Sequence, residues 1–352
     1  MKCINLFFSL FSMLFLLISC GSSDDDFNSG PIVDDCLGLG AEKLSLKIQD
    51  HYTTLPGKVS VLFKVTTKDG NHLVAGLTAT NFKIFEKGSN DNCYKPISAS
   101  ESNGRISSKS QIFNTNTLLI LDLSNSVLST SLEELKLAST SFIEQVMPST
   151  PSDEFKMGVY WFDGEDKLHE LNPLTTDRTE LITAIDGITT DISNDPSTDL
   201  YGAVIKATDS ATAILEENKK EEILAAASVV IFTDGSDQAA RYSKDNAINK
   251  VQNADENISF FSIGLGSEIE TNILDKIGKN GSAYAANKEE LEDTFEEISE
   301  DVEGQANSFY LFEYCSPKRS GKNLLVIQAI QGENQGSVQT QFDATGFTGG
   351  CE

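Results

Sequence analysis

The sequence predicts an α/β domain with a doubly wound, mostly parallel sheet, inserted into an all-β sandwich formed by the flanking segments. Residues 115–304 alternate apolar, strand-like runs with segments of helical period. Residues 36–114 and 305–352 instead show the period-2 alternation of half-buried strands. The ends of an inserted domain lie close together at its surface, so such an insertion is topologically simple. Two separate small β domains are the alternative, and each would have a thin core.

Residues 1–19 have the layout of a secretory signal peptide. Lys2 precedes the apolar run "INLFFSLFSMLFLLI", which is too short for a comfortable membrane span. The stretch "LISC" that follows resembles a lipobox, and this resemblance implies a lipid on Cys20 of the mature chain. An ordinary signal peptide with an incidental cysteine is the alternative.

Residues 20–35 are predicted to be an acidic tether, because "GSSDDDFNSGP" is polar and too poor in apolar residues to fold. The "SSDDD" stretch resembles the acidic export tag of surface-displayed lipoproteins in some Gram-negative bacteria. The resemblance implies a lipid-anchored protein of the outer membrane that is exposed at the cell surface. Retention on the periplasmic side is the alternative.

The flanking β segments are read from alternation and turn signals. In the first segment, "KLSLKIQ" and "VSVLFKVTT" alternate, "KDGN" marks a turn, and a further strand runs from Phe82 to Glu86. In the second segment, "PKRSGK" and "QGENQG" separate three predicted strands, "SFYLFEYC", "NLLVIQAI" and "SVQTQFDA".

The central segment opens with "TLLILDL", a continuous apolar run typical of a strand buried on both faces. A helix is expected in "SLEELKLASTSFIEQVM", with Ser131 as its cap and Glu134 completing a capping box. Further strands are predicted in "FKMGVYWF", "SVVIFTD" and "ISFFSIGLG", and further helices in "DRTELITAIDGI", "LYGAVIKATDSATAILEE" and "RYSKDNAINKVQNA". The last helix is expected to begin after a cap at Asn287 and to bury one face, formed by Leu291, Phe295, Ile298 and Val302.

The chain has 53 acidic and 27 basic residues, a net charge of −26, so binding to nucleic acid or anionic lipid is not expected. Four cysteines remain when Cys3 and Cys20 are set aside, namely Cys36, Cys93, Cys315 and Cys351. In an exported chain they predict two disulfides, and the sequence does not choose among the three connectivities. No CxxC occurs and His51, His72 and His169 are scattered, so no metal site built from cysteine or histidine is predicted.

Oxygen-bearing side chains follow the buried strands of the central segment. Asp122, Ser124 and Ser126 leave the end of "TLLILD", Asp234 follows "SVVIFT", and Thr198 lies on a loop before a helix. Ligands of open parallel sheets bind beyond the carboxyl ends of the strands. Carboxylates and hydroxyls suit Mg²⁺ or Ca²⁺ better than zinc or copper.

This pattern resembles the von Willebrand factor A domain and its metal-ion-dependent adhesion site. "DLSNS" supplies the DxSxS pattern, "STDLYGA" the threonine and "FTDGS" the aspartate, and the resemblance covers about residues 115–304. It implies Mg²⁺, or Ca²⁺ or Mn²⁺, held by Asp122, Ser124 and Ser126, with Thr198 joining in the ligand-bound state and Asp234 binding directly or through water. Asn125 stands where the family often has glycine, which puts the shape of this loop in doubt.

The expected function is adhesion-like binding of a protein or glycan ligand that offers an acidic group to the cation. Envelope assembly, in which the domain docks a neighbouring membrane protein, is the alternative. Specificity is expected in the loops 125–130, 191–197 and 236–242. An enzyme is not expected, because the sequence has no GxSxG, HExxH or P-loop motif. His169, in "KLHEL", is interpreted as a surface histidine rather than a base.

Overall fold

The computed structural model describes residues 36–70, 72–98, 104–107, 113–221 and 223–351. The chain divides into Met1–Pro31 and Ile32–Glu352, and the description below concerns the second unit. The predicted signal peptide 1–19, the tether 20–35 and the lipidation site Cys20 lie outside the described residues. Among the described residues, no helix is long and apolar enough to cross a membrane.

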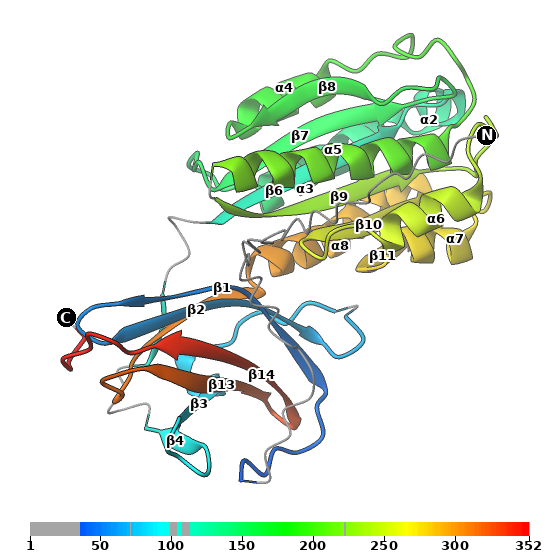
Figure 1. Cartoon of the computed structure of the whole chain (residues 1–352). Helices are drawn as coiled ribbons and strands as arrows, with labels where there is room; N and C mark the ends of the chain where they lie inside the picture. Colours follow the sequence, from blue (N-terminus) through cyan, green and yellow to red (C-terminus); the bar gives the residue numbers. More distant parts are fainter. Residues whose placement is uncertain (1–35, 71, 99–103, 108–112, 222, 352) are drawn as a thin grey trace, which may run out of the picture. The chain divides into compact units, whose positions relative to one another are not determined.

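A six-stranded sheet forms the centre of the α/β region, in the order β11-β10-β9-β6-β7-β8 (Figure 1). All neighbouring strands are parallel except β8, which runs antiparallel to β7, so the predicted mostly parallel sheet is confirmed. The strands are β6 (Phe113–Asp122), β7 (Phe155–Phe162), β8 (His169–Thr175), β9 (Leu224–Thr233), β10 (Ile258–Leu265) and β11 (Gly281–Ala285).

Helices cover both faces of this sheet (Figure 1). Leu119 and Leu121 of β6 share one apolar core with α3, α4 and α8, whereas Leu118 and Ile120 share another with α5, α6 and α7. Successive residues of a strand point to opposite faces, which explains why a strand between two helix layers is apolar throughout. The helices are α2 (Asn125–Thr130), α3 (Leu132–Val146), α4 (Arg178–Asp186), α5 (Leu200–Lys220), α6 (Lys244–Gln252), α7 (Thr271–Ile277) and α8 (Leu291–Ala306), with a 3₁₀ turn η2 (Lys288–Glu290).

The predicted capping box at Ser131 is wrong. Ser131 does precede α3, but its side chain makes no capping bond and its hydroxyl donates to the carbonyl of Val127 at 3.4 Å. The reason is α2, which the sequence analysis missed. Because the chain is already helical before Ser131, the Ser131 amide also bonds back to Val127 at 3.0 Å.

The predicted cap at Asn287 is also wrong, whereas the buried face of α8 is confirmed. Asn287 precedes η2 and donates from its amide nitrogen to Glu290, whose carboxylate also accepts the Ala286 amide. Glu290, and not Asn287, is the residue directly before α8. The four apolar residues predicted to face inward, Leu291, Phe295, Ile298 and Val302, are all buried.

Two four-stranded antiparallel sheets form the flanking region, and each combines strands from both sides of the α/β segment. In the first sheet β2 pairs with β12, and in the second β3 pairs with β13. The two sheets share one apolar core, so the flanking segments build a single sandwich. Its elements are β1 (Leu44–Thr54), β2 (Lys58–Thr67), η1 (Ala79–Asn81), β3 (Phe82–Gly88), β4 (Lys95–Ile97), β5 (Arg105–Ser107), β12 (Phe309–Cys315), β13 (Lys322–Gln331) and β14 (Asn334–Asp343).

Each flanking segment contains one disulfide, which gives the two disulfides predicted from the cysteine count. They join Cys36 to Cys93 and Cys315 to Cys351, and each spans 5.6 Å between Cα atoms. This settles the connectivity that the sequence left open, because each bridge stays within its own flanking segment.

Candidate metal centre

Strands β6 and β9 lie side by side in the central sheet and end at the same edge. Leu121 pairs with Phe232 in parallel register, so the next residues, Asp122 and Thr233, end the two strands at the same edge. Asp234 follows at once. The register of two buried strands thus brings two aspartates that are far apart in the sequence to one edge, where open α/β sheets bind their ligands.

Four of the five predicted residues are linked there by a chain of contacts. The Ser124 amide donates to Asp122 Oδ1 at 3.0 Å, and the Ser124 and Ser126 hydroxyl oxygens lie 3.3 Å apart. The Ser126 hydroxyl donates to Asp234 Oδ1 at 2.9 Å. From the strand itself, the Thr233 hydroxyl donates to Asp122 Oδ2 at 2.6 Å and fixes that carboxylate. The structure therefore gathers Asp122, Ser124, Ser126 and Asp234 at one point.

Thr198, the fifth predicted residue, is buried, and its backbone ties it to the same edge of the sheet. Its carbonyl accepts the amides of Gln238 and Ala239, at 2.9 and 3.0 Å, from the loop that follows Asp234. Nearby, the Asn125 amide donates to the carbonyl of Pro196 at 3.1 Å, which ties this loop to the DxSxS turn. Within the part of the chain that is described, the Thr198 hydroxyl makes no hydrogen bond to the other four residues.

The two aspartates have perturbed titration. Burial, followed by the nearby Asp234, raises the pKa of Asp122 to about 7, against the opposing hydrogen bonds from Thr233 and Ser124. Burial likewise raises the pKa of Asp234, which the hydrogen bond from Ser126 opposes. No basic side chain is among the main causes of either shift. A buried and a half-buried carboxylate with neutral hydroxyls beside them are a donor set that fits a hard divalent cation.

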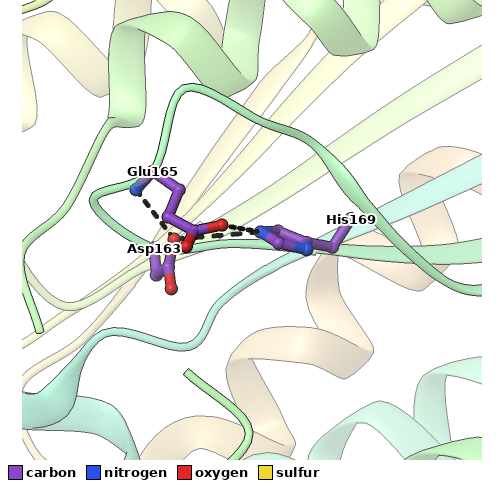
Figure 2. Close-up of side chains that lie close together, drawn as sticks. All are labelled: Asp163, Glu165 and His169. Carbon is purple, nitrogen blue, oxygen red and sulfur yellow. Dashed lines mark hydrogen bonds and ion pairs between the residues drawn. The ribbon is translucent and has the colours of Figure 1, made fainter. Parts of the chain in front are cut away.

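A second cluster lies on the neighbouring strand end and was missed by the sequence analysis. Asp163 follows β7 directly, Glu165 lies on the turn, and His169 begins β8 (Figure 2). His169 Nε2 is 3.3 Å from Glu165 Oε2 and 3.9 Å from Asp163 Oδ1. The acidic pair just after an apolar strand was visible in the sequence, but the pairing of β8 with β7 that brings His169 beside it was not.

The expectation that His169 is a surface histidine is wrong. Only 12% of its side chain is exposed, and its ring stacks on Trp161 with centroids 3.9 Å apart and planes 10° apart. The cause is the register of β8, which places His169 opposite Trp161. Burial, followed by the charge of Lys167, lowers the pKa of His169 despite the opposing carboxylates of Asp163 and Glu165, so the imidazole is neutral at pH 7.

Asp163 also positions the loop that carries Thr198. Its Oδ2 accepts the Ser193 hydroxyl at 2.7 Å and the Asp195 amide at 3.3 Å. Its carbonyl accepts the Asp199 amide at 2.9 Å, directly after Thr198. The second cluster and the loop beside the first cluster are therefore connected through one buried aspartate.

Comparison with known protein families identifies the α/β region. The family model for the von Willebrand factor type A domain matches residues 116–301. The chain belongs to the von Willebrand factor type A (vWA) domain family. The resemblance drawn from "DLSNS", "STDLYGA" and "FTDGS" is confirmed at the level of the family and its fold. Domains of this family commonly bind other proteins and often hold a divalent cation.

Among solved structures, the vWA protein is similar to several bacterial proteins of low sequence identity. A conserved hypothetical protein BatB from Bacteroides thetaiotaomicron is 17% identical, with a TM-score of 0.43 over 55% of this chain and 100% of that one. A von Willebrand factor type A protein from Catenulispora acidiphila is 12% identical, with a TM-score of 0.44 over 84% of this chain and 75% of that one.

The vWF domain of the type V pili tip protein Mfa5 from Porphyromonas gingivalis is also 12% identical, with a TM-score of 0.40 over 54% of this chain and 95% of that one. Likenesses at this level carry no information on a ligand. The comparison with curated proteins gives no match.

Proposed function

We propose that this vWA protein is a binding module that holds a protein or glycan ligand through a divalent cation, Mg²⁺ or alternatively Ca²⁺ or Mn²⁺. The observation that supports this most is the chain of contacts joining Asp122, Ser124, Ser126 and Asp234 at the carboxyl edge of the sheet. Two aspartates and adjacent hydroxyls, supplied by the ends of separate strands, form an oxygen-only site at this edge of the sheet.

The proposed division of labour follows from the chemistry of the donors. Asp122 and Asp234 provide negative charge, while Ser124, Ser126 and Thr198 provide neutral oxygens. When bound, the cation would supply an electrophilic position at which an acidic group of the ligand replaces a water. Thr198 is buried on a separate loop, and we propose that its hydroxyl joins the site only when a ligand is present. This role is one of binding and not of catalysis.

The setting that we propose for this module is the cell surface. A lipid on Cys20 would anchor the chain in the outer membrane, and the acidic tether 20–35 would hold the folded region away from it. The disulfides Cys36–Cys93 and Cys315–Cys351 suit an exported protein. The net charge of −26 disfavours direct contact with anionic lipid, so the binding site would remain free for a ligand outside the membrane.

The test is a capture of ligands from extracellular matrix and from the surface fraction of neighbouring cells, with elution by EDTA. Ser126→Ala removes one oxygen of the site, and Ser149→Ala, at an exposed serine beyond α3, is the matched control. We expect partners that EDTA releases, that Ser126→Ala fails to capture and that Ser149→Ala captures normally. Partners that stay bound in EDTA and bind both variants equally would contradict the proposal.

A further inference from the structure

We propose that Asp163, Glu165 and His169 form a second cation site, distinct from the site at Asp122, that takes Zn²⁺ or a similar transition-metal ion. The three side chains come from one short stretch of the chain, from the end of β7 through the turn to the start of β8 (Figure 2). None of them belongs to the motif of the first site.

The distances within the cluster fit a shared ion. One ligand atom from each residue can be chosen so that all three lie within 4.8 Å of one another. His169 Nε2 lies 3.3 Å from Glu165 Oε2 and 3.9 Å from Asp163 Oδ1. Two ligands of a tetrahedral zinc ion, each bonded at about 2.1 Å, lie about 3.4 Å apart. The distance from His169 to Glu165 matches this spacing, and the distance from His169 to Asp163 exceeds it by about 0.5 Å.

The nitrogen of His169 gives independent support. Nε2 has almost no accessible surface and no hydrogen-bond partner, although two carboxylate oxygens lie near it. A buried polar atom is almost always paired, so an unpaired one requires an explanation. The Asp163 and Glu165 oxygens lie near Nε2 but form no hydrogen bond with it. This arrangement is expected when an ion lies between the three atoms. Figure 2 shows the imidazole edge facing both carboxylates.

The surroundings hold these ligands in place before any ion binds. Trp161 stacks on the imidazole and fixes its plane. Asp163 is fully buried, with Oδ1 accepting the Glu165 amide at 2.8 Å and Oδ2 accepting the Ser193 hydroxyl at 2.7 Å. Metal ligands are usually oriented in this way by hydrogen bonds from outside the coordination shell.

The donor set distinguishes this site from the first one. One imidazole and two carboxylates are typical zinc ligands, and three protein ligands leave a fourth position for water. The oxygen-only set around Asp122 favours Mg²⁺ or Ca²⁺ instead. The chain would thus carry two neighbouring sites with different metal preferences.

The test is a calorimetric titration of Zn²⁺ into the metal-stripped full chain. All proteins in it carry Asp122→Ala, because zinc also enters oxygen sites and this substitution removes the first site. We expect one zinc ion to bind to the Asp122→Ala protein. Adding His169→Ala or Glu165→Gln should weaken that binding about 100-fold or more, since even residues outside the coordination shell change affinity 10–100-fold. Adding His72→Ala, at an exposed histidine, is the matched control and should change nothing.

Two measurements keep this test interpretable. His169→Ala alone should bind Mg²⁺ as the wild type does, which shows that the variant is folded. Should Asp122→Ala not fold, Glu165→Gln alone, at a side chain that is 39% exposed, should lower the number of bound zinc ions by one. Absence of zinc binding to a folded Asp122→Ala protein, or equal zinc affinity with and without His169, would overturn the proposal and leave a metal-free contact between an imidazole and two carboxylates.

Discussion

Lowering the pH from 8 to 6 should weaken Mg²⁺ binding to this vWA domain about tenfold. Protons and the cation compete for the carboxylate of Asp122. Burial and the neighbouring Asp234 raise the pKa of this carboxylate to about 7. At pH 8 most Asp122 side chains are ionised and free to bind Mg²⁺, whereas at pH 6 most carry a proton. Affinity therefore falls as the pH falls, and the raised pKa of Asp234 acts in the same direction.

The magnitude follows from the fraction of Asp122 that is ionised. With a pKa of about 7, this fraction is about 0.9 at pH 8 and about 0.09 at pH 6, a tenfold change or about 1.4 kcal/mol of binding free energy. An aspartate with the ordinary pKa of 3.8 would change by about 1% over the same range. In the metal-free protein the sign is reversed: the raised pKa stabilises the fold at low pH, and this contribution is lost as the pH rises through about 7.

The assay is a calorimetric Mg²⁺ titration of the full chain at several pH values between 5 and 8. Thr233→Val removes the hydroxyl that donates to Asp122 Oδ2 at 2.6 Å, so it should move the midpoint to higher pH. Thr117→Val, at a buried threonine of the neighbouring strand β6, is the matched control and should leave the midpoint unchanged. Equal Mg²⁺ affinity at pH 8 and pH 6, or equal midpoints in the two variants, would show that Asp122 does not titrate in this range.

Three further predictions concern the core, the ligand and the anchor. Phe295→Ala, in the buried face of α8 against Phe142 and Phe232, should lower the free energy of unfolding by about 3–5 kcal/mol in urea denaturation; a loss below about 1 kcal/mol would contradict the packing. Thr198→Ala should weaken binding of a captured partner more than binding of Mg²⁺, and equal losses would argue against a ligand-dependent role. Cys20→Ala should abolish labelling by a fatty-acid analogue in cells, and persistent labelling would reject the anchor.

The fold could be predicted where a local pattern reports directly on burial. Leu118 to Leu121 are apolar without interruption because alternate residues enter two different cores. Phe295 and its neighbours recur at helical spacing because α8 packs only one face against the sheet. Asp122 and Asp234 could be placed together because parallel strands end at a common edge, and their register then fixes the two residues as neighbours.

Features set by pairing between distant segments could not be predicted. The strand β8 has a weak apolar pattern and contains Pro173, which edge strands tolerate, so nothing local marks it as a strand. Without β8, nothing brings His169 to Asp163 and Glu165. The disulfide partners of Cys36 and Cys315 depend in the same way on how the flanking segments fold, and four cysteines alone leave three choices.

The helix starts show a third kind of limit. Serine or asparagine before an apolar period usually indicates a cap, but a preceding turn can take over that role. The Ser131 amide bonds back to Val127 of the preceding helix α2. The Asn287 side-chain amide donates to the carboxylate of Glu290, which also accepts the backbone amide of Ala286. The helices themselves were correctly expected, because their buried faces and not their caps decide whether they form.

Cation binding by Asp122 and its neighbours can be measured by a calorimetric titration of Mg²⁺ at pH 8. Wild type and Asp122→Ala are compared as metal-stripped full chains, with Asp186→Ala, at an exposed aspartate of α4, as the matched control. We predict one Mg²⁺-binding event in the wild type and in the control, and none in Asp122→Ala, with circular dichroism showing the same fold in all three. Equal heats from wild type and a folded Asp122→Ala protein would contradict the account.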